Sequence, residues 1–173
     1  TLLYNAGRAN DSRETLQHTG LQLEQGYGLV TLHRPSNVDD PRVLSSLVDT
    51  LLTINTDLEL VFPVHPRTLQ QLQKHNLLHK LESSRIALLE PQGYLQMLGL
   101  MKDARVVLTD SGGIQEETTA LGVPCITLRD NTERPITVSE GTNVLAGADP
   151  DKILAAFNQV MNDGGKLGQI PEY

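Results

Sequence analysis

Short apolar runs alternate along the chain with longer segments in which apolar positions recur every three or four residues. The run at 27–33 ("YGLVTLH") is typical of a buried strand, and the segment 41–54 after it has the spacing of an amphipathic helix. The same alternation predicts further strands at 58–64, 85–90, 104–110 and 123–128, and a short one near 142–147. It also predicts helices that start at Pro66 and that span about 94–102, 114–121 and 150–162.

Nearly continuous apolar strands, each followed by a helix, indicate a parallel sheet that is covered on both faces. We therefore predict a doubly wound, Rossmann-like α/β fold that forms a single domain over 1–173. The polar segment 1–20 is expected to belong to a truncated connection between domains. Such sheets bind ligands beyond the carboxyl ends of their strands. Unusual polar residues follow the predicted strands there: His33 and Arg34, His65, the segment 110–113, and Arg129.

Charge and composition exclude several classes of protein. The net charge of −7 argues against a nucleic-acid binder, which needs a basic face. No apolar run has the length of a membrane span, so no membrane partner is expected. The single cysteine, Cys125, cannot form an internal disulfide, which fits the cytoplasm, and it is expected to be a small core residue.

The segment "TDSGGIQEE" (109–117) combines a predicted strand end, two glycines and a helix start. Gly112 and Gly113 would let backbone amides approach an anion, and the free N–H groups of a helix start favour phosphate. The Ser111 hydroxyl adds a further donor. Two interpretations of Glu116 and Glu117 remain open: charges that suit the first helical turn, or an acceptor for ribose hydroxyls.

The histidines and arginines near the strand ends also have two interpretations. A lone histidine is more often structural, but the strand-end positions of His33 and His65 favour function. The loop "LRDNTERP" (128–135) is polar like most surface loops, yet its arginines could bind a diphosphate. The chain has no GxGxxG after its first strand, no P-loop, and no HExxH or paired Cys/His spacing. These absences disfavour a nicotinamide enzyme and predict no metal site.

Several segments together resemble the non-hydrolysing UDP-N-acetylglucosamine 2-epimerases: "VTLHRPSNVDD", "HPR", "TDSGGIQEE", "GVPCITLRDNTERP" and "EGTNVLAG". The resemblance runs over nearly the whole chain and covers the carboxyl-terminal half of the family. It implies the glycosyltransferase-B architecture, in which two Rossmann-like domains enclose the active site. The implied reaction eliminates UDP from the substrate to give a 2-acetamidoglucal and adds UDP back, yielding UDP-N-acetylmannosamine without a cofactor.

The resemblance also implies roles for individual residues. His33 matches an essential histidine near the departing phosphate, and Glu117 matches the glutamate that binds the ribose. Met97 stands where many members have Phe beside the uracil, which leaves the base contact open. The diphosphate would be held by Ser111, Gly112, Gly113 and Arg134. Their positions at or beyond predicted strand ends make Arg34, His65 and Arg129 further candidates for substrate binding.

The family's proton-handling carboxylates lie in its amino-terminal half, which this sequence does not include. The expected partners are a UDP-sugar, that amino-terminal domain, and a second copy of the intact protein in a homodimer. The chain by itself is expected to be inactive. A glycosyltransferase of the same architecture, or a non-catalytic module that binds a nucleotide sugar, remain as alternatives.

Overall fold

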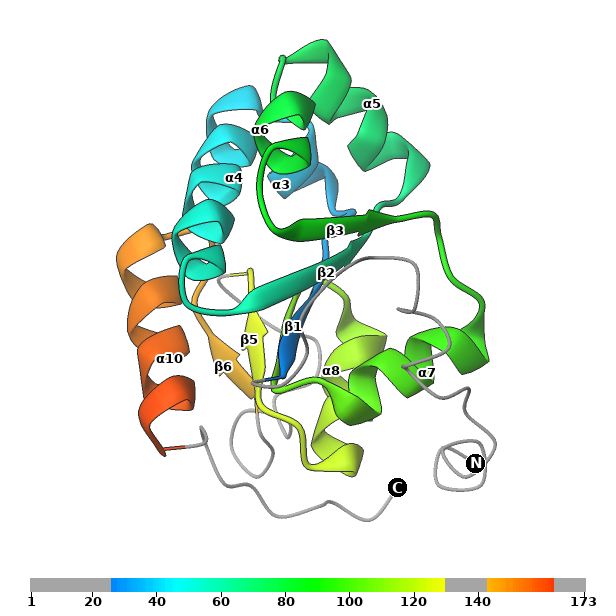
Figure 1. Ribbon diagram of the computed structural model, residues 1–173, viewed down its shortest axis with the longest axis vertical. Helices are drawn as coiled ribbons and strands as arrows, with labels where there is room; N and C mark the ends of the chain where they lie inside the picture. The colour runs from blue at the N-terminus through cyan, green and yellow to red at the C-terminus, as the bar shows by residue number, and fades with distance from the viewer. Residues whose placement is uncertain (1–25, 130–142, 164–173) are drawn as a thin grey trace.

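The computed structural model describes residues 26–129 and 143–163, which form one six-stranded sheet (Figure 1). Every strand pair is parallel, and the order is β3-β2-β1-β4-β5-β6. This order confirms the doubly wound arrangement that the alternating pattern predicts. The strands are β1 Tyr27–Thr31, β2 Glu59–Pro63, β3 Ile86–Leu89, β4 Val106–Thr109, β5 Cys125–Thr127 and β6 Asn143–Leu145.

The five predicted helices are present, with boundaries within a few residues of those expected. They are α4 Pro41–Asn55, α5 Pro66–Lys74, α7 Tyr94–Asp103, α8 Gly112–Leu121 and α10 Pro150–Asp163. Two short helices were not predicted, α3 Pro35–Val38 and α6 Leu78–Glu82, because four or five residues are too few to show a helical period. No helix within the described ranges is long and apolar enough to cross a membrane.

Helices cover both faces of the sheet, and each face has its own core (Figure 1). Successive strand residues point to opposite faces, so Val30 and Leu108 pack toward α4 and α10, whereas Leu29 and Val107 pack toward α7. Both faces of the central strands are therefore buried, which explains why these runs are apolar at nearly every position. The predicted segment 1–20 lies outside the described residues.

Local signals set the ends of the helices. The Asp40 carboxylate accepts a hydrogen bond from the Arg42 backbone N–H and caps α4. Gly122 ends α8 in the left-handed conformation, with φ of 73°, which a residue without a β-carbon adopts readily. Cys125 is buried as predicted, and burial raises the pKa of its thiol to about 11.

Candidate functional site

The site lies where the strand order reverses. After β1 the chain continues to β2 on one side of the sheet, and after β4 it continues to β5 on the other side. The carboxyl ends of β1 and β4 are neighbours, with Thr31 opposite Thr109. Such a switch point opens a crevice in doubly wound sheets. The segments 33–34 and 110–113 therefore meet, as the sequence predicts.

Asp110 is the structural centre of this edge, and its side chain is fully buried. Its carboxylate lies 2.9 Å from His33 Nδ1 and accepts hydrogen bonds from the backbone N–H groups of His33 and Arg34, at 3.1 and 2.9 Å. Asn37 Nδ2 donates to the same carboxylate at 3.1 Å and to the Leu128 carbonyl at 2.9 Å. The Asp110 carboxylate thus connects the segments that follow β1 and β4, and Asn37 extends the connection to the segment that follows β5.

No role for Asp110 or Asn37 is predicted from the sequence. Asp110 directly follows the apolar strand β4, and an acidic residue at a buried strand end needs several donors to offset its desolvation. That signal was available in the sequence. The identity of the donors was not, because they come from positions more than 70 residues earlier.

Asp110 and His33 shift each other's pKa. The hydrogen bond to Asp110 raises the pKa of His33, and partial burial opposes this change only in part. Burial by itself would raise the pKa of Asp110, but hydrogen bonds from His33, Arg34 and Asn37 outweigh it and keep that pKa lowered. A charged pair is therefore favoured. The His33 side chain is 44% exposed, so the rest of its ring is accessible from outside.

His65 lies at the same edge, after β2, but it is an exposed helix cap. Its Nδ1 accepts a hydrogen bond from the Arg67 backbone N–H at 3.2 Å, at the start of α5. Its ring lies 6.3 Å from that of His33, with the two planes at 84°. The structure therefore brings the two predicted histidines together.

The turn after Asp110 is open to the outside. Ser111 precedes α8 and makes no side-chain cap bond to it, while its backbone N–H donates to Thr109 Oγ1 at 3.0 Å. A β-carbon placed on Gly112 or Gly113 would meet no atom of residues 26–129 or 143–163 within 4 Å. Packing within the described protein therefore does not require glycine at either position. The open space above this helix start would accommodate a ligand.

Helix α8 begins at Gly112, two residues earlier than predicted. Glu116 and Glu117 consequently lie in its second turn, and the first turn carries no acidic residue. Their interpretation as first-turn charges is wrong, because Gly112 and Gly113 are themselves helical. Glu117 is half-buried, and burial raises its pKa although it accepts a hydrogen bond from Tyr94. Its Oε2 atom is buried with no hydrogen-bond partner in the described part of the chain.

Helix α7 lies beside α8 and brings two further side chains to this region. Tyr94, at the start of α7, is 51% exposed and reaches Glu117. Met97 is half-buried and packs against the core on this face of the sheet, as does Ile114 of α8. Met97 therefore lies on the helix that also carries the partner of Glu117.

The two arginines from opposite sides of the edge share a pocket of about 530 Å³. It is lined by Arg34, Pro35, Ser36, Asn37, Val43, Leu128, Arg129 and Ala148. Arg34 and Arg129 are thus brought close to the Asp110 network, which shares Asn37. Arg134 lies outside the described residues.

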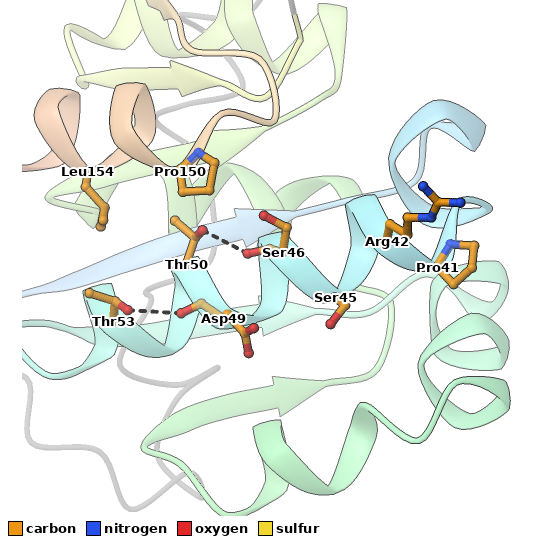
Figure 2. A pocket seen from close by; sticks show the side chains of 9 residues that line it. All are labelled: Pro41, Arg42, Ser45, Ser46, Asp49, Thr50, Thr53, Pro150 and Leu154. Atoms are coloured by element: carbon orange, nitrogen blue, oxygen red, sulfur yellow. Dashed lines mark hydrogen bonds between the residues drawn. The ribbon is translucent and has the colours of Figure 1, made fainter.

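A larger hollow of about 650 Å³ lies between α4 and α10 (Figure 2). Two of its hydroxyls already donate to carbonyls of their own helix, Thr50 to Ser46 at 2.8 Å and Thr53 to Asp49 at 3.1 Å. Its charged lining residues are Arg42 and Asp49, whose charges are opposite. An anion therefore finds less to bind there than at the edge near His33.

Comparison with known proteins identifies relatives of this chain. A sequence profile described as UDP-N-acetylglucosamine 2-epimerase matches residues 1–172. A protein of that name from Methanococcus maripaludis is 47% identical over 138 residues, which are 78% of this chain and 38% of the relative. A UDP-2,3-diacetamido-2,3-dideoxy-D-glucuronate 2-epimerase from Pseudomonas aeruginosa is 40% identical over 153 residues, 86% of this chain and 42% of that protein.

Solved structures agree with these matches. The chain superposes on the UDP-GlcNAc 2-epimerase of Methanocaldococcus jannaschii in complex with UDP-GlcNAc and UDP, with a TM-score of 0.85 at 39% identity, over 99% of this chain and 48% of that one. A sucrose-phosphate synthase from Thermosynechococcus elongatus shares the fold alone, with a TM-score of 0.62 at 18% identity. The architecture is that of one half of the glycosyltransferase-B fold. The chain spans about 40% of the length of its curated relatives.

Proposed function

The chain belongs to the UDP-N-acetylglucosamine 2-epimerase family, and we propose that it is the UDP-binding half of an enzyme that interconverts UDP-N-acetylglucosamine and UDP-N-acetylmannosamine. In this reaction the proton at C2 is removed and the bond from C1 to the diphosphate oxygen breaks, leaving UDP and 2-acetamidoglucal. UDP then adds back to C1 while a proton reaches C2 from the other face. Both steps move only a proton and UDP, with no hydride or electron transfer, so the proposal includes no cofactor.

The open turn at the start of α8 is the observation that carries this proposal. Ser111 is unbonded to the helix through its side chain, and Gly112 and Gly113 leave space above the helix start. Free backbone N–H groups there, together with the helix dipole, favour a diphosphate. The similar M. jannaschii enzyme was solved in complex with UDP-GlcNAc and UDP, which supports a UDP-sugar as the ligand class.

Glu117 is proposed to bind the ribose. Its buried Oε2 lacks a hydrogen-bond partner among the described residues, and burial opposes its ionisation. Two ribose hydroxyls would supply the missing donors and restore the charged form. Met97 is proposed to contact the uracil, because it lies on α7 together with Tyr94, and its thioether can pack against a ring.

His33 is proposed as the catalytic residue of this half. Its raised pKa favours an imidazolium, which would stabilise the negative charge that develops on the departing diphosphate. Arg34, Arg129 and Arg134 are proposed to supply further positive charge, with His65 beside them. Arg34 and Arg129 line the adjacent pocket, which supports their part in the proposal.

The acid and base that exchange the C2 proton are proposed to come from an amino-terminal half of the same protein. The intact protein is proposed to form a homodimer. Nearby carboxylates of this half have other structural roles. Asp39 forms an ion pair with Arg67, Asp40 caps α4, and Asp110 is buried. Light scattering of the full-length protein would test the dimer.

Solvent isotope exchange tests the reaction. The full-length protein incubated with UDP-N-acetylglucosamine in D₂O should incorporate deuterium at C2 and release some UDP and glucal. His33→Ala should lower turnover by roughly 10²–10⁴-fold while affecting substrate binding less. Sugar transfer to an acceptor without exchange would indicate a glycosyltransferase, and UDP binding without either activity would indicate a binding module.

The match to the P. aeruginosa enzyme favours a second candidate substrate. That protein is named as a 2-epimerase of a UDP-2,3-diacetamido-2,3-dideoxy-D-glucuronate, and it is 40% identical over 86% of this chain. Both names describe inversion at C2 of a UDP-sugar, so the same UDP-binding half would serve either reaction. Comparison of kcat/KM for the two UDP-sugars decides between them.

A further inference from the structure

We propose that Asp110 is a positioning residue, which holds the His33 ring with Nδ1–H directed into the protein and Nε2–H directed at the departing phosphate. The proposal rests on the proposed function for the identity of the phosphate. The fixed orientation of the ring is a property of this chain and can be tested without substrate.

The contact with Asp110 fixes the Nδ1 side of the His33 ring. Asp110 Oδ1 lies 2.9 Å from His33 Nδ1, and this carboxylate is fully buried while the His33 side chain is 44% exposed. An ionised carboxylate only accepts hydrogen bonds, so Nδ1 must carry the proton in this contact. In an imidazole ring Nε2 lies on the opposite side from Cβ and Nδ1, so it is directed away from the buried carboxylate. There it can donate to a ligand once the ring is protonated.

Asp110 is itself held against rotation. The Arg34 backbone N–H and Asn37 Nδ2 both donate to Oδ2, at 2.9 and 3.1 Å. Asn37 is anchored in turn by its 2.9 Å bond to the Leu128 carbonyl. The His33 backbone N–H also donates to Oδ2, at 3.1 Å. Three donors therefore hold Oδ2, and Oδ1 faces the His33 ring at Nδ1. The segments after three strands cooperate in placing one imidazole ring, which is the rigid support that a reacting group needs.

The charges around His33 in the described part of the chain favour a protonated ring. Asp110 raises its pKa by a hydrogen bond and by Coulomb attraction, whereas Arg34 opposes this effect. His65 lies 6.3 Å away, with its Nδ1 accepting from the Arg67 backbone. Since Asp110 provides the largest effect, its removal should reverse the shift.

The isosteric change Asp110→Asn makes a sharp test. The amide must keep its oxygen at the Oδ2 position to accept from the backbone N–H groups of His33 and Arg34 and from Asn37. Its NH₂ group therefore faces His33 Nδ1. A donor in that position forces the neutral ring into the opposite tautomer and opposes protonation. The fold is expected to persist, because the change conserves shape and one accepting oxygen.

Nitrogen NMR of the imidazole rings should show Nδ1–H in neutral His33 of the wild-type chain and Nε2–H in Asp110→Asn, with a lower His33 pKa in the variant. In the full-length enzyme the variant should lose roughly 10²-fold in turnover and shift its pH profile, with UDP affinity changed only a few-fold. Asp39→Asn is the matched control, because Asp39 pairs with Arg67 at the same edge and should leave the His33 signals unchanged.

The His33 tautomer of the wild-type chain, measured by NMR, tests the role of Asp110 even if the variant fails to fold. An Nε2–H tautomer in the wild-type chain would overturn it, as would unchanged turnover in Asp110→Asn. If the wild-type enzyme shows no deuterium exchange at C2, the proposed function fails instead. The NMR result would then still decide whether Asp110 orients His33.

Discussion

At the scale of single residues, the carboxyl groups of Asp110 and Glu117 are both at least partly buried, but their pKa values shift in opposite directions. Asp110 has donors on both oxygens, so its ionised form is stabilised although it is fully buried. Glu117 has one buried oxygen with no partner among the described residues, and burial raises its pKa. A group that opposes folding in this way is a candidate for function rather than for structure.

Glu117→Gln should weaken UDP binding by about tenfold or more, because a charged acceptor for hydroxyls contributes roughly 1.5–3 kcal/mol. The same change should stabilise the fold at neutral pH. The folded-state pKa of Glu117 is raised, so its contribution to stability declines as pH rises through that pKa, and an amide avoids this loss. Calorimetric titration with UDP and urea unfolding measure the two effects.

Glu116→Gln is the control, since Glu116 lies in the same turn about 100° around the helix. Equal, near-wild-type affinities in both variants would contradict the ribose role of Glu117.

The His33–Asp110 pair should give the stability of the chain a pH dependence. The folded pKa of His33 is raised, so its charged contribution is complete below the unfolded value of 6.5 and is lost as pH rises through the folded pKa. His33→Asn keeps a donor near the Nδ1 position but cannot titrate. Urea unfolding should show the variant less stable by about 1 kcal/mol near pH 5.5, because half-exposure weakens the pair, and closer to wild type near pH 9. The same difference at both pH values would contradict the assignment.

At the scale of elements, helix α8 begins with Gly112 and Gly113 and is ended by Gly122, and the two ends have glycine for different reasons. Gly122 ends the helix with φ of 73°, which the backbone itself requires. Gly112 and Gly113 begin it with helical geometry and with empty space around the β-carbon position. Packing in the described part of the chain does not require these two glycines, which agrees with their proposed contact with a diphosphate.

Substitution by alanine should therefore have opposite effects at the two ends of α8. Gly113→Ala should stabilise the chain, by at most about 1 kcal/mol, and should weaken UDP binding by about tenfold as the methyl group blocks the phosphate. Gly122→Ala should destabilise by roughly 1–2 kcal/mol and leave UDP affinity unchanged. Thermal unfolding of each variant, with and without UDP, measures its stability and its UDP binding. A Gly113→Ala chain that binds UDP normally would place the diphosphate elsewhere.

At the scale of the whole molecule, the described residues form a six-stranded sheet with a core on each face, yet the chain spans about 40% of the length of its curated relatives. In the proposed function, folding and UDP binding depend on contacts within this half. Proton exchange at C2 depends, in the proposed mechanism, on carboxylates outside it. We therefore expect this chain to fold and bind UDP without exchanging the C2 proton.

The isolated chain should unfold cooperatively and bind UDP without epimerising UDP-N-acetylglucosamine. Urea unfolding, titration with UDP, and NMR of the sugar in D₂O would measure the three properties. Deuterium at C2 in the presence of the chain alone would contradict the assignment of proton transfer to another half. Mixing the chain with a separately produced amino-terminal half is the complementary experiment, which should restore exchange.

The order of the strands and helices was predictable from the sequence by itself. Strands such as "ARVVLTD" are apolar on both faces because both faces of the sheet are covered, and that pattern is local. The motif "DSGG" at a strand end was likewise visible, and with it the expectation of a site at that edge. Arg134 and the segment 1–20 lie outside the described residues and stay predictions.

Only the tertiary structure decided which side chains meet and where α8 begins. Asp110 acquires its role through donors from 33–37, which adjoin it because β1 and β4 pair in space. Glu117 changes from a first-turn charge to a half-buried acceptor because α8 starts two residues earlier and α7 packs beside it. Periodicity reports which face of an element is buried, whereas partners and protonation depend on contacts between distant segments, which no local pattern encodes.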